Sequence, residues 1–223
     1  MKVSEIIYRV KAVIDELPNS GEGNIVGDEA YDNLSSIIRD KIPYALEWVL
    51  INAPQTKIDS SMVTSFEGGS AESGGQLEMT FGIDYMVTVK LPDNFLRILS
   101  ARLSSWYYSP IPVSEFSETA LLQQSRVAKG CPDMPVTVLC TEDRNKVLKM
   151  YTAESKKDKL YVEIICKPES TTTDDMTDIA VPTKTIKSFI YYIAYLTLLA
   201  FRDASASNFL AEASRELSVN KEE

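Results

Sequence analysis

Residues 181–217 read VPTKTIKSFIYYIAYLTLLAFRDASASNFLAEASREL, and this stretch decides how the rest of the chain must pack. Between Lys187 and Arg202 lie fourteen residues without a charge, most of them large and apolar. A bilayer span needs about 20 such residues, so we expect no membrane contact. The run is also too apolar all round for a helix on the surface of a small monomer. We therefore expect one side to pack inside the domain and the other against another subunit.

Three tyrosines in this run, Tyr191, Tyr192 and Tyr195, are candidate interface residues. Neighbouring positions on a helix point about 100° apart, so these side chains cannot all face the same way. At least one must therefore point away from the core of its own chain. Their hydroxyl groups suit an interface, and burial in the core is the alternative.

The apolar pattern predicts helices at both ends of the chain and strands between them. We expect helices over residues 3–17, from Asp28 onward, over 43–52 with Pro43 in its first turn, over 181–201 and over 205–217. Strands are expected over 62–66, 76–81, 83–91, 97–108, 136–141, 146–152 and 159–166. For residues 97–108 a helix is the alternative. The connections 142–145 and 153–158 have the length and composition of hairpin turns. A short helix over 114–127 would be capped by Ser114.

These elements predict an α+β fold, in which N- and C-terminal helices form one bundle with an antiparallel β sandwich or barrel inserted between them. The expected parts are an N-terminal helical part over residues 1–60 and a β region with a short helix over 61–166. A polar linker over 167–182 and C-terminal helices over 183–218, which complete the bundle, follow. The tail at 219–223 should fray.

Composition limits the classes of function. The net charge of −9 argues against a general nucleic-acid binder, which needs a basic face. Charges throughout residues 1–17 break any signal sequence, so we expect synthesis in a cytoplasm. Apolar residues make up 44% of the chain, a globular composition.

The residues offer little for catalysis. The chain has no histidine, which removes the commonest general base and metal ligand. The glycine-rich stretch 21–27 lacks the Lys–Ser/Thr ending of a phosphate loop, and Asp174, Asp175 and Asp178 do not have calcium-loop spacing. We expect these aspartates in a solvated linker and all three cysteines as small buried residues. No catalytic, cofactor or metal site is expected, and we expect no enzyme; a carboxylate-based enzyme is the least favoured alternative.

An aromatic cluster, Trp106, Tyr107 and Tyr108, is followed by Pro110 and Pro112. Trp and Tyr are enriched at the centres of protein interfaces, so this cluster is a candidate binding surface. The alternative is that alternate rings fill the β core while Tyr108 points outward.

The order of three segments resembles a known group of proteins. KIPYALEWVLINAP at residues 41–54 is followed by LPDNFLRILSARLSSW at 91–106, then by the β region and the closing segment quoted above. This order resembles head-to-tail connector proteins of crAss-like tailed bacteriophages, which infect gut Bacteroidales. The resemblance covers most of the chain and rests on apolar pattern, so no functional residue is carried over.

The resemblance implies a structural virion protein without cofactors. Such proteins form a homo-oligomeric ring, commonly twelve-fold, that joins the portal to the tail and contacts the portal and neighbouring ring or tail proteins. DNA passes through the lumen without specific binding, which suits an acidic chain. The alternative is a small cytoplasmic adaptor or regulatory protein that binds a protein partner through its aromatic surface.

Overall fold

In a computed structural model, residues 1–15, 28–82, 85–125, 129–168 and 174–218 are described. The glycine-rich stretch 21–27 and the tail at 219–223 lie outside them. The chain divides into two compact units. Met1–Ser60 and Pro168–Glu223 form a helical unit, and Ser61–Lys167 form a β unit.

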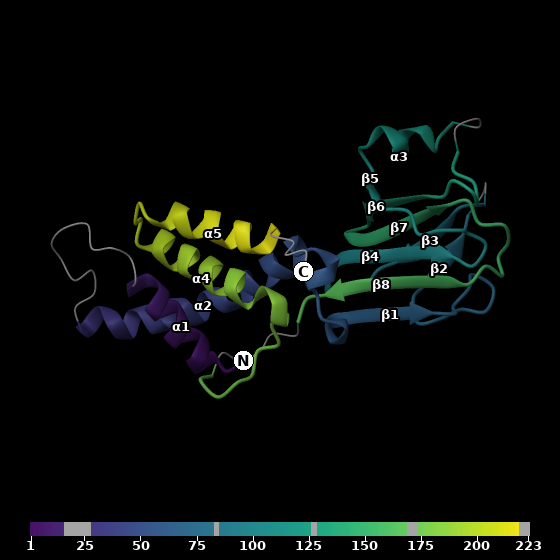
Figure 1. The fold of residues 1–223 in the computed structure, drawn as a ribbon. Coiled ribbons are helices and arrows are strands. Elements are labelled where there is room, and N and C mark those ends of the chain that lie inside the picture. The colour runs from purple at the N-terminus through teal and green to yellow at the C-terminus, as the bar shows by residue number, and fades with distance from the viewer. Residues whose placement is uncertain (16–27, 83–84, 126–128, 169–173, 219–223) are drawn as a thin grey trace. The chain divides into compact units, whose positions relative to one another are not determined.

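The helical unit is a bundle built from both ends of the chain (Figure 1). Its helices are α1 (Val3–Asp15), α2 (Asp28–Asn52), α4 (Ile186–Ala200) and α5 (Ala206–Ser218). Helix α4 contacts α1, α2 and α5. The prediction that N- and C-terminal helices pack together is therefore confirmed. None of the helices described is both long and apolar enough to cross a membrane.

Helix α4 satisfies more of its apolar surface within the chain than the sequence suggested. Ile193 and Ala194 are fully buried, and the α5 residues Phe209, Ala213 and Leu217 are buried as well. Helix α5 folds back and packs against α4, while Leu199 at the C-terminal end of α4 stays 51% exposed. The amphipathic pattern of α5 supplies the apolar face that this packing requires. Contact of α4 with another subunit stays a prediction.

Helix α2 corrects the prediction of two separate helices divided at Pro43. The helix runs unbroken through Pro43, although a proline has no amide hydrogen to donate to the carbonyl of Arg39. The Pro43 ring is exposed, so it does not disturb the packed side. Apolar residues continue on that side across the proline, with Leu34, Ile38, Ile42, Ala45, Val49 and Leu50 all buried. Continuous burial thus outweighs the one lost hydrogen bond.

The described part of the segment leading into α4 keeps Asp174, Asp175 and Asp178 exposed, as predicted for a polar linker, while its backbone is hydrogen-bonded to α1. The backbone amides of Val3 and Ser4 donate to the carbonyls of Thr177 and Asp175, at 3.1 and 3.2 Å. These bonds satisfy donors in the first turn of α1 that have no partner within the helix. Ile179 is 2% exposed, and the Asp175 carboxylate pairs with Arg39 of α2.

The β unit contains two sheets (Figure 1). One has the order β1 (Val63–Glu67), β8 (Leu160–Cys166), β4 (Phe95–Leu103). The other has the order β2 (Met79–Phe81), β3 (Val87–Lys90), β7 (Asn145–Tyr151), β6 (Val136–Glu142), β5 (Val113–Ser114). Among the described strands every pairing is antiparallel except that of β5 with β6, which is parallel.

Alternate residues of both sheets form one core, so the β unit is a sandwich. Leu103, Val162 and Ile164 from one sheet and Val89 and Met150 from the other belong to the same buried cluster. This alternation is what a strand with one buried face requires. The α+β fold class predicted from the sequence is confirmed.

The two predicted hairpin turns have different outcomes. Residues 142–145 connect the paired strands β6 and β7, with Asp143 and Arg144 at positive φ, as a tight hairpin turn needs. Residues 153–158 instead cross from β7 in one sheet to β8 in the other. The Asp158 carboxylate accepts hydrogen bonds from the amides of Glu154 and Ser155, so the segment turns without joining paired strands.

Two smaller predictions need correction. The short helix is α3 (Glu118–Leu122), and its cap is Ser117, which accepts a hydrogen bond from the amide of Ala120, whereas Ser114 lies in β5. Cys140 is buried as predicted and Cys166 is half-buried, but Cys131 is exposed because it lies in a turn outside the sheets.

Candidate protein-interaction surfaces

Trp106 does not belong to an exposed aromatic surface, which corrects that part of the prediction. Its side chain is 3% exposed and lies in the sandwich core. Its indole Nε1 donates a hydrogen bond of 2.9 Å to the carbonyl of Thr152. A buried indole with a satisfied N–H is a core residue, so Trp106 is not available for contact with a partner protein.

Tyr107 and Tyr108 are exposed, by 83% and 49%, and they begin a stretch of sequence with several exposed apolar side chains. We call residues 107–122 the apolar segment. Its exposed large apolar side chains are Tyr107, Tyr108, Ile111, Phe116, Leu121 and Leu122. Single exposed apolar residues are normal, but a concentration of six in one short segment is typical of an interaction surface.

The backbone of the apolar segment is fixed by the β unit. Strand β5 pairs with β6 at the edge of the larger sheet, beside α3 in Figure 1. Buried Gln123 accepts a hydrogen bond of 2.7 Å from the amide of Gly130 and donates one to the carbonyl of Thr119. Phe116, which is 85% exposed, therefore lies on a backbone that is hydrogen-bonded to its neighbours on both sides.

The start of the segment also covers part of a sheet edge. Ser109 Oγ accepts a hydrogen bond from the amide of Ala101 in edge strand β4 and donates one to the carbonyl of the same residue, both at 2.8 Å. Strand β4 further carries register shifts along its pairing with β8. Both features disfavour pairing of this edge with a strand from another chain, so side chains are the natural contacts here.

The tyrosines of α4 lie on two sides of the helix. Tyr192 stacks on Trp48 of α2, with ring centroids 4.0 Å apart, and Tyr195 lies 5.4 Å from Tyr192. Tyr191 instead lies 6.2 Å from the ring of Phe209 in α5. All three are half-buried. Each therefore has an aromatic partner within the chain and keeps some surface for contact with another molecule.

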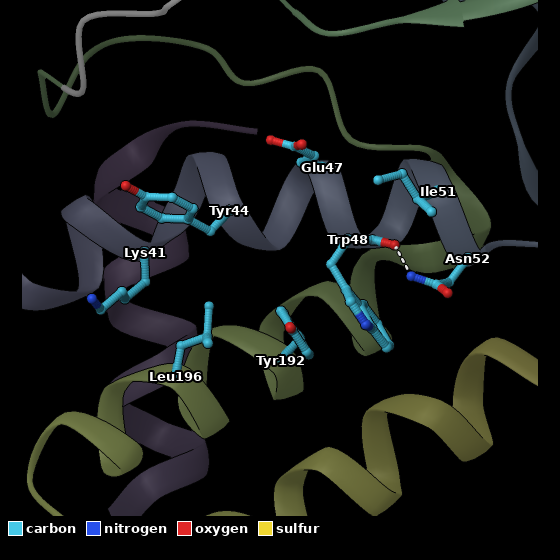
Figure 2. Close-up of a pocket in the computed structure, with 8 residues that line it drawn as sticks. All are labelled: Lys41, Tyr44, Glu47, Trp48, Ile51, Asn52, Tyr192 and Leu196. Atoms are coloured by element: carbon cyan, nitrogen blue, oxygen red, sulfur yellow. Dashed lines mark hydrogen bonds between the residues drawn. The ribbon is translucent and has the colours of Figure 1, made fainter. Parts of the chain in front are cut away.

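A groove of about 450 Å³ lies between α2 and α4, and we call it the α2–α4 groove. Figure 2 shows the Trp48 and Tyr192 rings side by side, with Tyr44 and Lys41 further along α2 and Leu196 further along α4. Tyr44 is 65% exposed. With Lys41 and Glu47 both in its lining, this groove carries no excess charge.

A second groove, of about 600 Å³, lies between α1 and α4, and we call it the α1–α4 groove. Val13, Ile186 and Ile190 contribute apolar surface, together with the Tyr191 ring. Arg9, Lys184 and Lys187 also line it, and among the described residues no carboxylate does. A basic groove is unusual on a chain with a net charge of −9.

The pKa shifts of three titratable side chains follow from burial or from a hydrogen bond. Burial raises the pKa of the Cys140 thiol and that of the Tyr192 hydroxyl. A hydrogen bond to Glu216 raises the pKa of Lys187. Among the described residues no cluster of three or more carboxylate or thiol side chains is placed to hold a metal ion.

The sequence analysis singled out Tyr107 and Tyr108 of the apolar segment but not Ile111, Phe116, Leu121 or Leu122. A signal for them exists in SPIPVSEFSETALL at residues 109–122, where prolines and serines interrupt both helical and strand periodicity. Apolar residues without a regular period have no single core face to join. Such a pattern favours exposure.

Comparison with models of known protein families gives no match, and comparison with curated proteins gives none either.

Proposed function

We propose that this chain is a structural protein of a tailed-phage virion, made in the bacterial host and assembled as a ring in the head-to-tail connector. The ring, commonly twelve-fold in the crAss-like connectors that the sequence resembles, would join the portal to the tail. Its contacts would be copies of itself, the portal, and neighbouring ring or tail proteins.

The observation that carries this proposal is that each unit presents its own unburied apolar surface. The helical unit has two grooves flanking α4, and the β unit has the apolar segment. A ring of identical subunits needs head-to-tail contacts, in which two different surfaces of each subunit meet. A chain with one self-complementary patch would favour a two-fold dimer instead.

The charge of the chain supports the proposed channel. At −9 the protein repels nucleic acid overall, so carboxylates facing the lumen would let DNA pass without adhering. Subunits that each carry this negative charge repel one another, so we expect them to associate where local charges are complementary.

A second candidate is an adaptor that binds one protein partner. The 83% exposure of Tyr107 and the 85% exposure of Phe116 favour it, because a single apolar segment is enough for one partner.

Measurement of mass separates the two candidates. The purified chain, alone over a range of concentrations and mixed with the portal protein of the same phage, would be examined by light scattering after size exclusion and by negative-stain electron microscopy. Rings in either sample support the connector. A chain that stays monomeric alone and forms no ring with the portal overturns it.

A further inference from the structure

We infer that the apolar segment of one copy docks in the α1–α4 groove of the next copy, and that this contact is the head-to-tail interface of the proposed ring. The inference rests on the proposed function, because it names the surfaces through which the ring would close. It commits to a second copy of this chain as the occupant of the groove.

Charge complementarity selects this groove. The apolar segment contains Glu115 and Glu118 and neither lysine nor arginine. In the described part of the chain the α1–α4 groove is lined by Arg9, Lys184 and Lys187 and by no carboxylate, whereas Lys41 and Glu47 balance in the α2–α4 groove. Opposite charges at the rim of an apolar contact fix its register and exclude wrong partners.

Each cation of the groove has a carboxylate nearby, but none of these carboxylates is among the lining residues. Arg9 pairs with Glu5 at 2.6 Å and Lys187 with Glu216 at 2.7 Å. The Asp59 carboxylate accepts hydrogen bonds from the amide and hydroxyl of Thr183, the residue before Lys184, at 2.9 and 3.0 Å. The described lining is therefore basic, and the balancing carboxylates lie outside it. The Lys187 side chain is 62% exposed, so its ion pair with Glu216 can rearrange to meet an arriving carboxylate.

Shape and chemistry agree with the charges. Phe116 lies between the two glutamates of the segment in sequence and is its most exposed aromatic side chain. The apolar surface from Val13, Ile186 and Ile190 offers a place where such a ring loses contact with water. Because β5 and the Ser117 cap hold the segment, docking requires little ordering of the backbone.

The test uses full-length chains that each lack one of the two surfaces. A donor variant, Phe116→Ser with Glu118→Lys, removes the inserted ring and reverses one charge. An acceptor variant, Ala12→Trp, fills the groove from its α1 side, and Arg9→Glu with Lys187→Glu serves as a second acceptor variant in case the tryptophan disturbs folding. Tyr44→Ser in the α2–α4 groove and Met134→Ser, exposed elsewhere in the β unit, are matched controls. Circular dichroism and melting curves check that every variant is folded.

We expect wild-type chain and both controls to form rings, and the donor and acceptor variants to be monomers when alone. An equimolar mixture of donor and acceptor variants should give a one-to-one dimer and nothing larger, because each dimer joins the one intact donor to the one intact acceptor. Folded variants that still form rings, or a mixture that gives no dimer, overturn this interface while wild-type rings leave the proposed function standing. Wild-type chain that is monomeric both alone and with the portal overturns both proposals.

Discussion

Tyr192 of α4 stacks on Trp48 of α2 with ring planes inclined by only 6° and ring centroids 4.0 Å apart. The two residues lie far apart in sequence, in helices from opposite ends of the chain. Their contact therefore forms only when the helices of the bundle have packed together. Both rings also line the α2–α4 groove in Figure 2.

A double-mutant cycle should find these two rings coupled. We expect Trp48→Ala and Tyr192→Ala each to lower the free energy of unfolding, and the double variant to lose less than their sum by about 1 kcal/mol, which is typical of an aromatic pair. Urea denaturation followed by circular dichroism measures all four proteins. The same cycle between Tyr44 and Tyr192 is the control, and a coupling no larger than in that control would show that the stack contributes nothing specific.

Trp106 should be essential to the β unit, although its neighbour Tyr107 should not be. Trp106→Ala removes a fully packed ring and should lower the free energy of unfolding by about 3–5 kcal/mol. Trp106→Phe keeps an aromatic ring but removes the Nε1 donor to Thr152, and we expect a smaller loss of about 1–3 kcal/mol. Tyr107→Ala should change stability by less than about 0.5 kcal/mol. Equal losses at the two positions would contradict the assignment of Trp106 to the core.

Replacing Pro43 with alanine should stabilise the bundle. The alanine amide can donate to the carbonyl of Arg39, and the exposed position leaves room for the change, so a gain of up to about 3 kcal/mol is expected from thermal and urea denaturation. Pro110→Ala is the matched control. In that irregular segment the change should destabilise slightly, by about 0.4–1 kcal/mol, through the entropy of the unfolded chain. A loss of stability in Pro43→Ala would contradict the view that the missing hydrogen bond is the main effect of this proline.

Asp203 should stabilise the turn between α4 and α5 in a pH-dependent way. Its carboxylate accepts hydrogen bonds from the amide and hydroxyl of Ser205, at 2.8 and 2.6 Å, and these bonds lower its pKa below the ordinary 3.8. A lowered pKa in the folded state means that the stabilisation is present above that ordinary value and is lost as the pH falls through the folded-state pKa. Asp203→Asn keeps an acceptor oxygen but removes the charge.

We therefore expect Asp203→Asn to be less stable than wild type at pH 7 and equal to it at the acid end of a series of urea titrations. Asp203→Ala also loses the acceptor, so part of its deficit, about 1 kcal/mol for a capping group, should persist at every pH. A deficit for Asp203→Asn that does not change with pH would assign the effect to something other than charge.

The sequence predicted the elements whose evidence is local. The helical spacing of Val3, Ile6 and Val10 is visible without a structure, and so is the turn at Asp143 and Arg144 between two alternating strands. The α+β class followed from the order of such elements. Local patterns are sufficient here because each element carries its own period.

The remaining features depend on contacts between distant residues. Pro43 predicts a helix start by its own chemistry, and only the buried face that continues past it keeps α2 in one piece. Residues 153–158 have turn composition, but the sheet that receives β8 is decided by its pairing with β1 and β4. Trp106 is equally suited to a core and to a surface until the carbonyl of Thr152 is placed beside its indole. Short-range sequence patterns cannot predict these three outcomes, because each depends on a contact between residues far apart in sequence.

The split construction of the bundle has a consequence for synthesis on the ribosome. Helices α1 and α2 emerge first, but α4, which contacts both of them, is translated only after the entire β unit. The β unit can close while its last strand, β8, is leaving the exit tunnel, whereas the apolar faces of α1 and α2 must wait for α4. Contacts between such distant residues slow folding and leave apolar surface exposed in the meantime. The nascent chain should therefore be most susceptible to aggregation, and most dependent on chaperones, in the interval between completion of β8 and release of α5.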